Sequence, residues 1–146
     1  MAESVFRARV AEAGLDGVVE VDSAGTGGWH EGDSADGRTV AVLEANGYES
    51  GHSARQFRAS WFPLLDLVIA LDEGHLRELR RLAPTAADAA KVRLLRSYDP
   101  SAAGDLDVPD PYYGGIDGFE ECLEMVEAAS EGLLDVVRMA AEERAA

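Results

Sequence analysis

Apolar residues recur at helical spacing in four stretches of the chain. The pattern predicts helices over residues 1–14, 34–46 and 72–82, and a long final helix from about Gly118 to the C-terminus. Glycine supplies a stop after the first two, and Asp72 has the side chain of a helix cap. The chain therefore contains enough amphipathic helix to cover a sheet.

Three shorter stretches have the composition of strands. Residues 18–21 are rich in β-branched side chains, residues 65–71 form a nearly continuous apolar run, and residues 91–95 form a third candidate. A continuous apolar run indicates a parallel strand covered on both faces. Because strands alternate with helices and no linker or repeat interrupts them, we predict one doubly wound α/β domain over residues 1–146.

The net charge of the chain argues against polyanionic binding partners. It carries 28 acidic and 13 basic residues, for a net charge of -15. Such a surface repels polyanions, so we expect neither nucleic acid nor an anionic membrane as a partner. No apolar run reaches the length of a membrane span and no signal-peptide pattern opens the sequence, which together predict a cytoplasmic protein.

The single cysteine, Cys122, excludes an internal disulfide and a site built from several cysteines. It lies at helical spacing with Phe119 and Val126, so we expect it on the buried face of the last helix. The three histidines match no metal-ligand spacing. We therefore expect no metal and no cofactor.

Two loops have the composition of sites. The glycine-rich segment 22–30 does not bind nucleotides in our interpretation, because His30 stands where a G-x-G-x-x-G motif needs its third glycine. The segment 107–115, D-V-P-D-P-Y-Y-G-G, holds a carboxylate and two aromatic rings on a turn stiffened by two prolines. By composition alone it could be an ordinary surface turn.

Several blocks, in order, resemble the low-molecular-weight protein tyrosine phosphatases over nearly the whole chain. They are D-S-A-G-T from Asp22, G-H-S-A-R-Q-F from Gly51, K-V-R-L-L-R-S-Y-D-P from Lys91 and D-V-P-D-P-Y-Y-G-G from Asp107. The resemblance implies a doubly wound parallel sheet. It also implies hydrolysis of a phosphotyrosine protein or a small aryl phosphate through a phosphocysteine.

The family's phosphate loop has the pattern C-x-G-N-x-C-R-S-P and comes just before the segment that is Met1-Ala2-Glu3 here. We therefore expect the first strand, the nucleophilic cysteine and the phosphate-binding arginine to be missing from this sequence. Cys122 does not replace the nucleophile, because the position six residues later, where the loop needs arginine, is Ala128. The chain as written is expected to be inactive.

The resemblance implies roles for several residues. Asp110 would be the general acid, while Trp29, Tyr112 and Tyr113 would contact the aryl ring. Ser23 and His52 would support the phosphate loop from behind, and Asp99 would support the site electrostatically. Trp29 could equally fold onto its own loop.

Two other readings stay open. The chain could be a binding-only pseudophosphatase that holds a partner on the surface formed by Trp29, Tyr112 and Tyr113. It could also act on phosphoarginine, although the paired tyrosines favour an aromatic substrate. An arsenate reductase on the same fold is disfavoured, because those enzymes relay through further cysteines that this sequence lacks.

Overall fold

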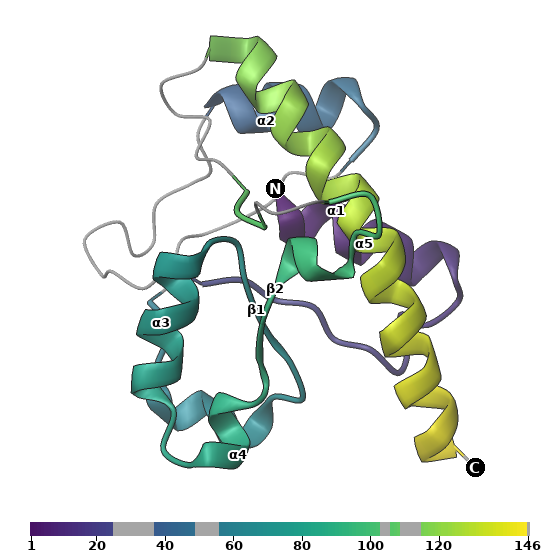
Figure 1. The fold of residues 1–146 in the computed structure, drawn as a ribbon. Coiled ribbons are helices and arrows are strands. Elements are labelled where there is room, and N and C mark those ends of the chain that lie inside the picture. The colour runs from purple at the N-terminus through teal and green to yellow at the C-terminus, as the bar shows by residue number, and fades with distance from the viewer. Residues whose placement is uncertain (25–36, 49–55, 103–105, 109–114, 146) are drawn as a thin grey trace.

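Helices cover both faces of a short parallel sheet (Figure 1). The computed structural model describes residues 1–24, 37–48, 56–102, 106–108 and 115–145. Along the chain the elements are α1 (Ala2–Glu12), α2 (Gly37–Ala45), the 3-10 helix η1 (Ala59–Leu64), β1 (Val68–Ala70), α3 (Glu73–Leu82), α4 (Ala86–Ala89), β2 (Val92–Leu94), the 3-10 helix η2 (Leu95–Tyr98) and α5 (Gly115–Ala145).

The sheet pairs β1 with β2 in parallel, with Val68 opposite Val92. Side chains alternate between its faces: Val68 and Ala70 enter one core, whereas Leu67, Ile69 and Leu71 pack against the other. The apolar run 65–71 thus contains a strand covered on both sides, as its composition predicted.

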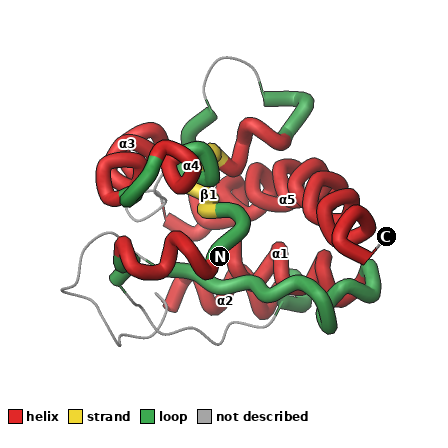
Figure 2. The backbone as a smooth tube through the Cα atoms, turned by 90° about the horizontal axis from the view of Figure 1, so that it is seen from below, coloured by secondary structure: helices red, strands yellow, loops and turns green. Residues whose placement is uncertain are grey.

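The two cores lie on opposite sides of this sheet. The larger is formed mainly by α1, α2 and α5, and the smaller lies under η1 and α3. Figure 2, viewed along a different axis, likewise separates α3 and α4 from the group of α1, α2 and α5. This layering confirms the predicted α/β class.

The long helix α5 supplies most of the larger core. Its buried side chains follow one stripe: Phe119, Cys122, Leu123, Val126, Ala129, Leu133 and Leu134. Cys122 is 6% exposed and is part of this stripe. The prediction that it is a buried core residue is confirmed.

The predicted helix ends are also found in the described residues. The Asp72 carboxylate accepts a hydrogen bond from the His75 amide at 2.7 Å and caps α3. Gly47 adopts φ +83° just beyond α2, a conformation that favours glycine. Residues 34–36, where the second predicted helix begins, lie outside the described residues.

The strand predicted at residues 18–21 is wrong. These residues form a turn and an irregular segment, with Val19 and Val21 packed against the larger core. A strand needs a hydrogen-bonded neighbour, and no described segment pairs with this one. A sheet of two strands within the described residues fits the expectation that the family's first strand is missing.

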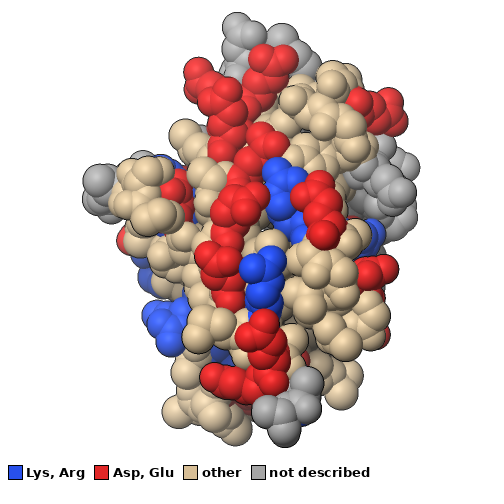
Figure 3. Space-filling view, turned by 90° about the vertical axis from the view of Figure 1, so that its right-hand side faces the viewer, with Lys and Arg blue, Asp and Glu red and all other residues tan. Residues whose placement is uncertain are grey.

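Acidic side chains gather in rows over the face that carries α5 (Figure 3). Exposed members on this helix include Glu120, Glu121, Glu124, Glu131 and Asp135. Among the residues that the structure describes, no helix combines the length and apolar character needed to cross a bilayer.

Candidate functional site

The carboxyl ends of the strands define the candidate site, since ligands of open α/β sheets bind at this edge. After β1, Leu71 and Asp72 lead directly into α3. The side chain of His75 is exposed, and its Nδ1 lies 3.3 Å from the Asp72 carboxylate. The strand end and the helix start are thus joined by the cap at Asp72.

The base of the predicted acid loop is attached to this strand end. The amide of Val108 donates to the carbonyl of Leu71 at 2.7 Å, and the Val108 side chain is buried. The Asp107 carboxylate accepts from the Glu73 amide at 2.9 Å, in the first turn of α3. Two adjacent residues of the chain are therefore held at the carboxyl edge of β1.

Arg96, which follows β2, also anchors residue Asp107. It lies in η2, just after β2, and its Nη1 donates to the Asp107 carbonyl at 2.8 Å. The ends of both strands thus converge on residues 107–108. Asp110, Tyr112 and Tyr113 follow within six residues but lie outside the described residues.

No local sequence pattern marks Arg96 or Asp107 as an anchor of this segment. Arg96 belongs to the R-S-Y-D-P block that follows a predicted strand, and Asp107 opens the proline-rich block. The position of a charged residue just after a predicted strand was therefore the feature of the sequence that could have indicated an anchor. The hydrogen bonds themselves join residues 11 and 34 positions apart, which periodicity does not detect.

Asp99 follows η2 and makes a local turn. Its carboxylate accepts from the Ser101 amide at 2.8 Å and from the Ser101 hydroxyl at 2.6 Å. The hydrogen bond from the hydroxyl, joined by that from the amide, holds the pKa of Asp99 below its usual range. Asp99 therefore stays ionised, and its part in the site remains a prediction.

Ser23 lies against α1 instead of at the strand ends described above. Its hydroxyl donates to the Glu3 carboxylate at 2.7 Å, and Glu3 also lies 3.2 Å from the Arg7 guanidinium. Arg7 in turn donates to the Val21 carbonyl at 2.8 Å. Ser23 is thus fixed at the amino end of α1, while Trp29 and His52 lie outside the described residues.

These features define an α/β protein whose candidate site lies at the carboxyl edge of a parallel sheet, where residues 107–108 are held by both strand ends. A profile described as low molecular weight phosphotyrosine protein phosphatase matches residues 1–144. The chain belongs to this family.

Curated relatives support the same assignment. The chain is 74% identical over 147 residues to a low molecular weight protein-tyrosine-phosphatase of Streptomyces coelicolor, covering 100% of this chain and 90% of the relative. It is 46% identical to low molecular weight protein-tyrosine phosphatase A of Mycobacterium tuberculosis, covering 94% and 82% respectively.

Solved structures match the fold. A protein tyrosine phosphatase from Entamoeba histolytica, crystallised with Hepes in the active site, superposes with a TM-score of 0.90 at 30% identity, covering 95% of this chain and 88% of that one. YfkJ from Bacillus subtilis gives 0.87 at 34% identity, covering 95% and 86%. The predicted family is therefore confirmed.

Proposed function

We propose that this chain supplies the general acid and the aryl-binding residues of a protein tyrosine phosphatase, with Asp110 as the acid. The observation that carries the proposal is the hydrogen bond from the Val108 amide to the Leu71 carbonyl. It holds the backbone two residues before Asp110 at the carboxyl edge of β1, where α/β proteins bind ligands.

The proposed reaction proceeds through a phosphocysteine. A cysteine thiolate attacks phosphorus as the bond from phosphorus to the phenol oxygen breaks, and the Asp110 carboxyl gives its proton to that oxygen. The Asp110 carboxylate then takes a proton from the water that attacks the phosphocysteine. Phosphate leaves, and the thiolate and the protonated acid are restored.

The nucleophile of this reaction is not among the 146 residues. Cys122, the one cysteine of the sequence, is buried on the core face of α5, in the second turn of the helix. A reactive cysteine needs access to substrate and a local environment that favours the thiolate, such as a helix N-terminus. We therefore propose that these residues alone do not hydrolyse phosphate esters, and that turnover requires a nucleophilic cysteine and a phosphate-binding arginine that they do not provide.

Aromatic side chains would select the substrate. Trp29, Tyr112 and Tyr113 would flank the phenyl ring of a phosphotyrosine protein or a small aryl phosphate, since stacked rings favour aromatic over aliphatic esters. Ser23, His52 and Asp99 would support the phosphate loop and the charge of the site. A phosphoarginine substrate would instead be indicated if a competent enzyme cleaved phosphoarginine faster than phosphotyrosine.

The test uses a fusion in which a segment carrying the C-x-G-N-x-C-R-S-P pattern precedes Met1. We expect it to hydrolyse aryl phosphates, and Asp110→Ala to lower kcat by about 10²–10⁴-fold, because a positioned acid contributes about that factor. The loss should shrink for a 2,4-dinitrophenyl leaving group, which needs little protonation. Steady-state kinetics with phenyl and dinitrophenyl phosphates measure both effects.

The control variant is Asp135→Ala, which removes an exposed carboxylate from α5. It should leave kcat and its leaving-group dependence unchanged. Inorganic phosphate should inhibit the Asp110→Ala fusion as well as the parent, because the acid does not hold the phosphate. A fusion whose turnover is insensitive to Asp110→Ala would contradict the assigned role.

A further inference from the structure

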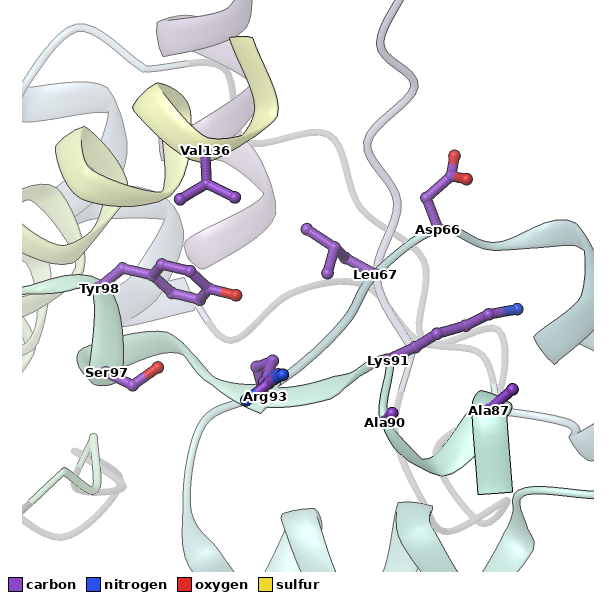
Figure 4. Close-up of a pocket in the computed structure, with 9 residues that line it drawn as sticks. All are labelled: Asp66, Leu67, Ala87, Ala90, Lys91, Arg93, Ser97, Tyr98 and Val136. Carbon is purple, nitrogen blue, oxygen red and sulfur yellow. The ribbon is translucent and has the colours of Figure 1, made fainter. Parts of the chain in front are cut away.

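A pocket that is open to solvent lies away from the candidate site, between the sheet and α5. Its volume is about 630 Å³, and two of its lining residues, Arg93 and Val136, are exposed. Leu67, just before β1, and Lys91, just before β2, line it, so it borders the amino ends of the strands. Val136 of α5 faces it from the opposite side (Figure 4).

Two hydrogen-bond donors in this cavity are available for a ligand. Arg93 projects from β2, and the Tyr98 phenol points toward Leu67 across the space (Figure 4). Neither the Arg93 guanidinium nor the Tyr98 hydroxyl makes a hydrogen bond or ion pair with another residue of the described ranges. The Tyr98 hydroxyl is a donor at neutral pH, as for any tyrosine, and burial raises its pKa further.

The other charged groups of the cavity already have partners. Lys91 Nζ lies 2.9 Å from the Asp88 carboxylate and donates to the Phe62 carbonyl at 2.8 Å. Asp66 at the rim is paired with Arg144 of α5. Among the charges that line the cavity, Arg93 is therefore the one that no described residue neutralises.

Charge and shape together indicate the class of ligand. A single unneutralised guanidinium matches one negative charge, and its planar fork suits a carboxylate. A dianion would be less well matched, because the chain as a whole carries a net charge of -15. Leu67, Val136 and the face of Tyr98 offer apolar surface beside this charge.

We propose that this cavity binds a small aromatic monocarboxylate. The carboxylate would accept hydrogen bonds from the Arg93 guanidinium and the Tyr98 hydroxyl, and the ring would pack between Leu67 and Val136. The proposal is independent of the phosphatase assignment, since none of these residues belongs to the proposed catalytic machinery.

The test is a titration of the 146-residue protein with 4-methylbenzoate, followed by calorimetry and by amide chemical shifts. We expect saturable binding that shifts the amides of Leu67, Arg93 and Val136. The neutral isostere 4-methylbenzamide, acetate and inorganic phosphate should each bind at least about tenfold more weakly, because each lacks either the charge match or the ring. Equal binding of the amide or of acetate would overturn the proposal.

Variants locate the site. Arg93→Gln should weaken 4-methylbenzoate binding by about tenfold or more, as expected for loss of a charged hydrogen bond. Arg77→Gln, which removes an exposed guanidinium from α3, should have no effect. Val136→Asp, at an exposed position of α5, should abolish binding by placing a carboxylate beside the ligand. Unchanged affinity in both Arg93→Gln and Val136→Asp, or no saturable binding to the parent, would refute the site.

Discussion

Arg9 and Tyr48 join three helices through a polar cluster. Arg9 of α1 donates to the Tyr48 hydroxyl at 2.9 Å, and its Nε lies 2.9 Å from Glu131 of α5. The Tyr48 hydroxyl, beyond the end of α2, donates to Glu127 of α5 at 2.5 Å. One tyrosine thus bridges an arginine and a carboxylate, and hydrogen bonds to charged groups are the stronger kind.

This cluster predicts how stability depends on pH. Burial, assisted by the hydrogen bond to Glu127, raises the pKa of Tyr48. As pH rises, the folded state therefore keeps the phenol proton to a higher pH than the unfolded chain does. The contribution of Tyr48 to the free energy of unfolding is complete below the unfolded pKa of about 10 and is lost as pH rises through the folded pKa. We expect Tyr48→Phe to cost about 1–3 kcal/mol at pH 8, and this difference to shrink by pH 11.

Urea unfolding of the parent and the Phe variant at both pH values measures the effect. Tyr98→Phe is the matched control, because Tyr98 is also partly buried but makes no hydrogen bond through its hydroxyl to another described residue. It should cost less at pH 8. A difference between parent and Tyr48→Phe that stays constant from pH 8 to pH 11 would contradict the account.

At the scale of elements, the contact between α5 and η2 is unusually close. A Cβ built on Gly132 would lie 1.9 Å from the Tyr98 carbonyl oxygen, well inside any allowed contact. Glycine is therefore required where α5 passes the segment that follows β2. This close packing fixes η2, from which Arg96 reaches the base of the acid loop.

Gly132→Ala should consequently destabilise the fold. In an unobstructed helix the same change would stabilise by about 1 kcal/mol, whereas here the backbone must move apart, at a cost of about 1–3 kcal/mol typical of overpacking. Urea unfolding measures whether Gly132→Ala lowers or raises the free energy of unfolding. Gly17→Ala, where a Cβ would meet nothing within 4 Å, should change the free energy of unfolding little. A more stable Gly132→Ala variant would show that the close approach is absent in solution.

The helices and the acid loop could be predicted from the sequence, whereas one strand and the anchors of the loop could not. Helices were found because caps such as Asp72 and stripes such as that of α5 are local patterns. The strand at residues 18–21 was wrong because a strand depends on a neighbour supplied by another part of the chain. In the candidate site, the block D-V-P-D-P-Y-Y-G-G predicts the acid loop. The hydrogen bonds that anchor this loop through Arg96 and Asp107 depend on tertiary contacts.

At the scale of the whole molecule, the strands separate two regions. Their carboxyl ends hold residues 107–108, which lead into the proposed acid loop, and their amino ends border the cavity of Arg93. We propose that the 146 residues contain the general acid and the aryl-binding side chains of a tyrosine phosphatase, but no working nucleophile.

The most direct measurement is the rate at which the 146-residue protein alone releases phosphate from phenyl phosphate, compared with the fusion that adds the C-x-G-N-x-C-R-S-P segment. Because Cys122 is buried, we predict no turnover above the uncatalysed rate for the chain alone and turnover for the fusion. Turnover by the chain alone that disappears in Cys122→Ser would contradict the claim, since it would place the nucleophile within these residues.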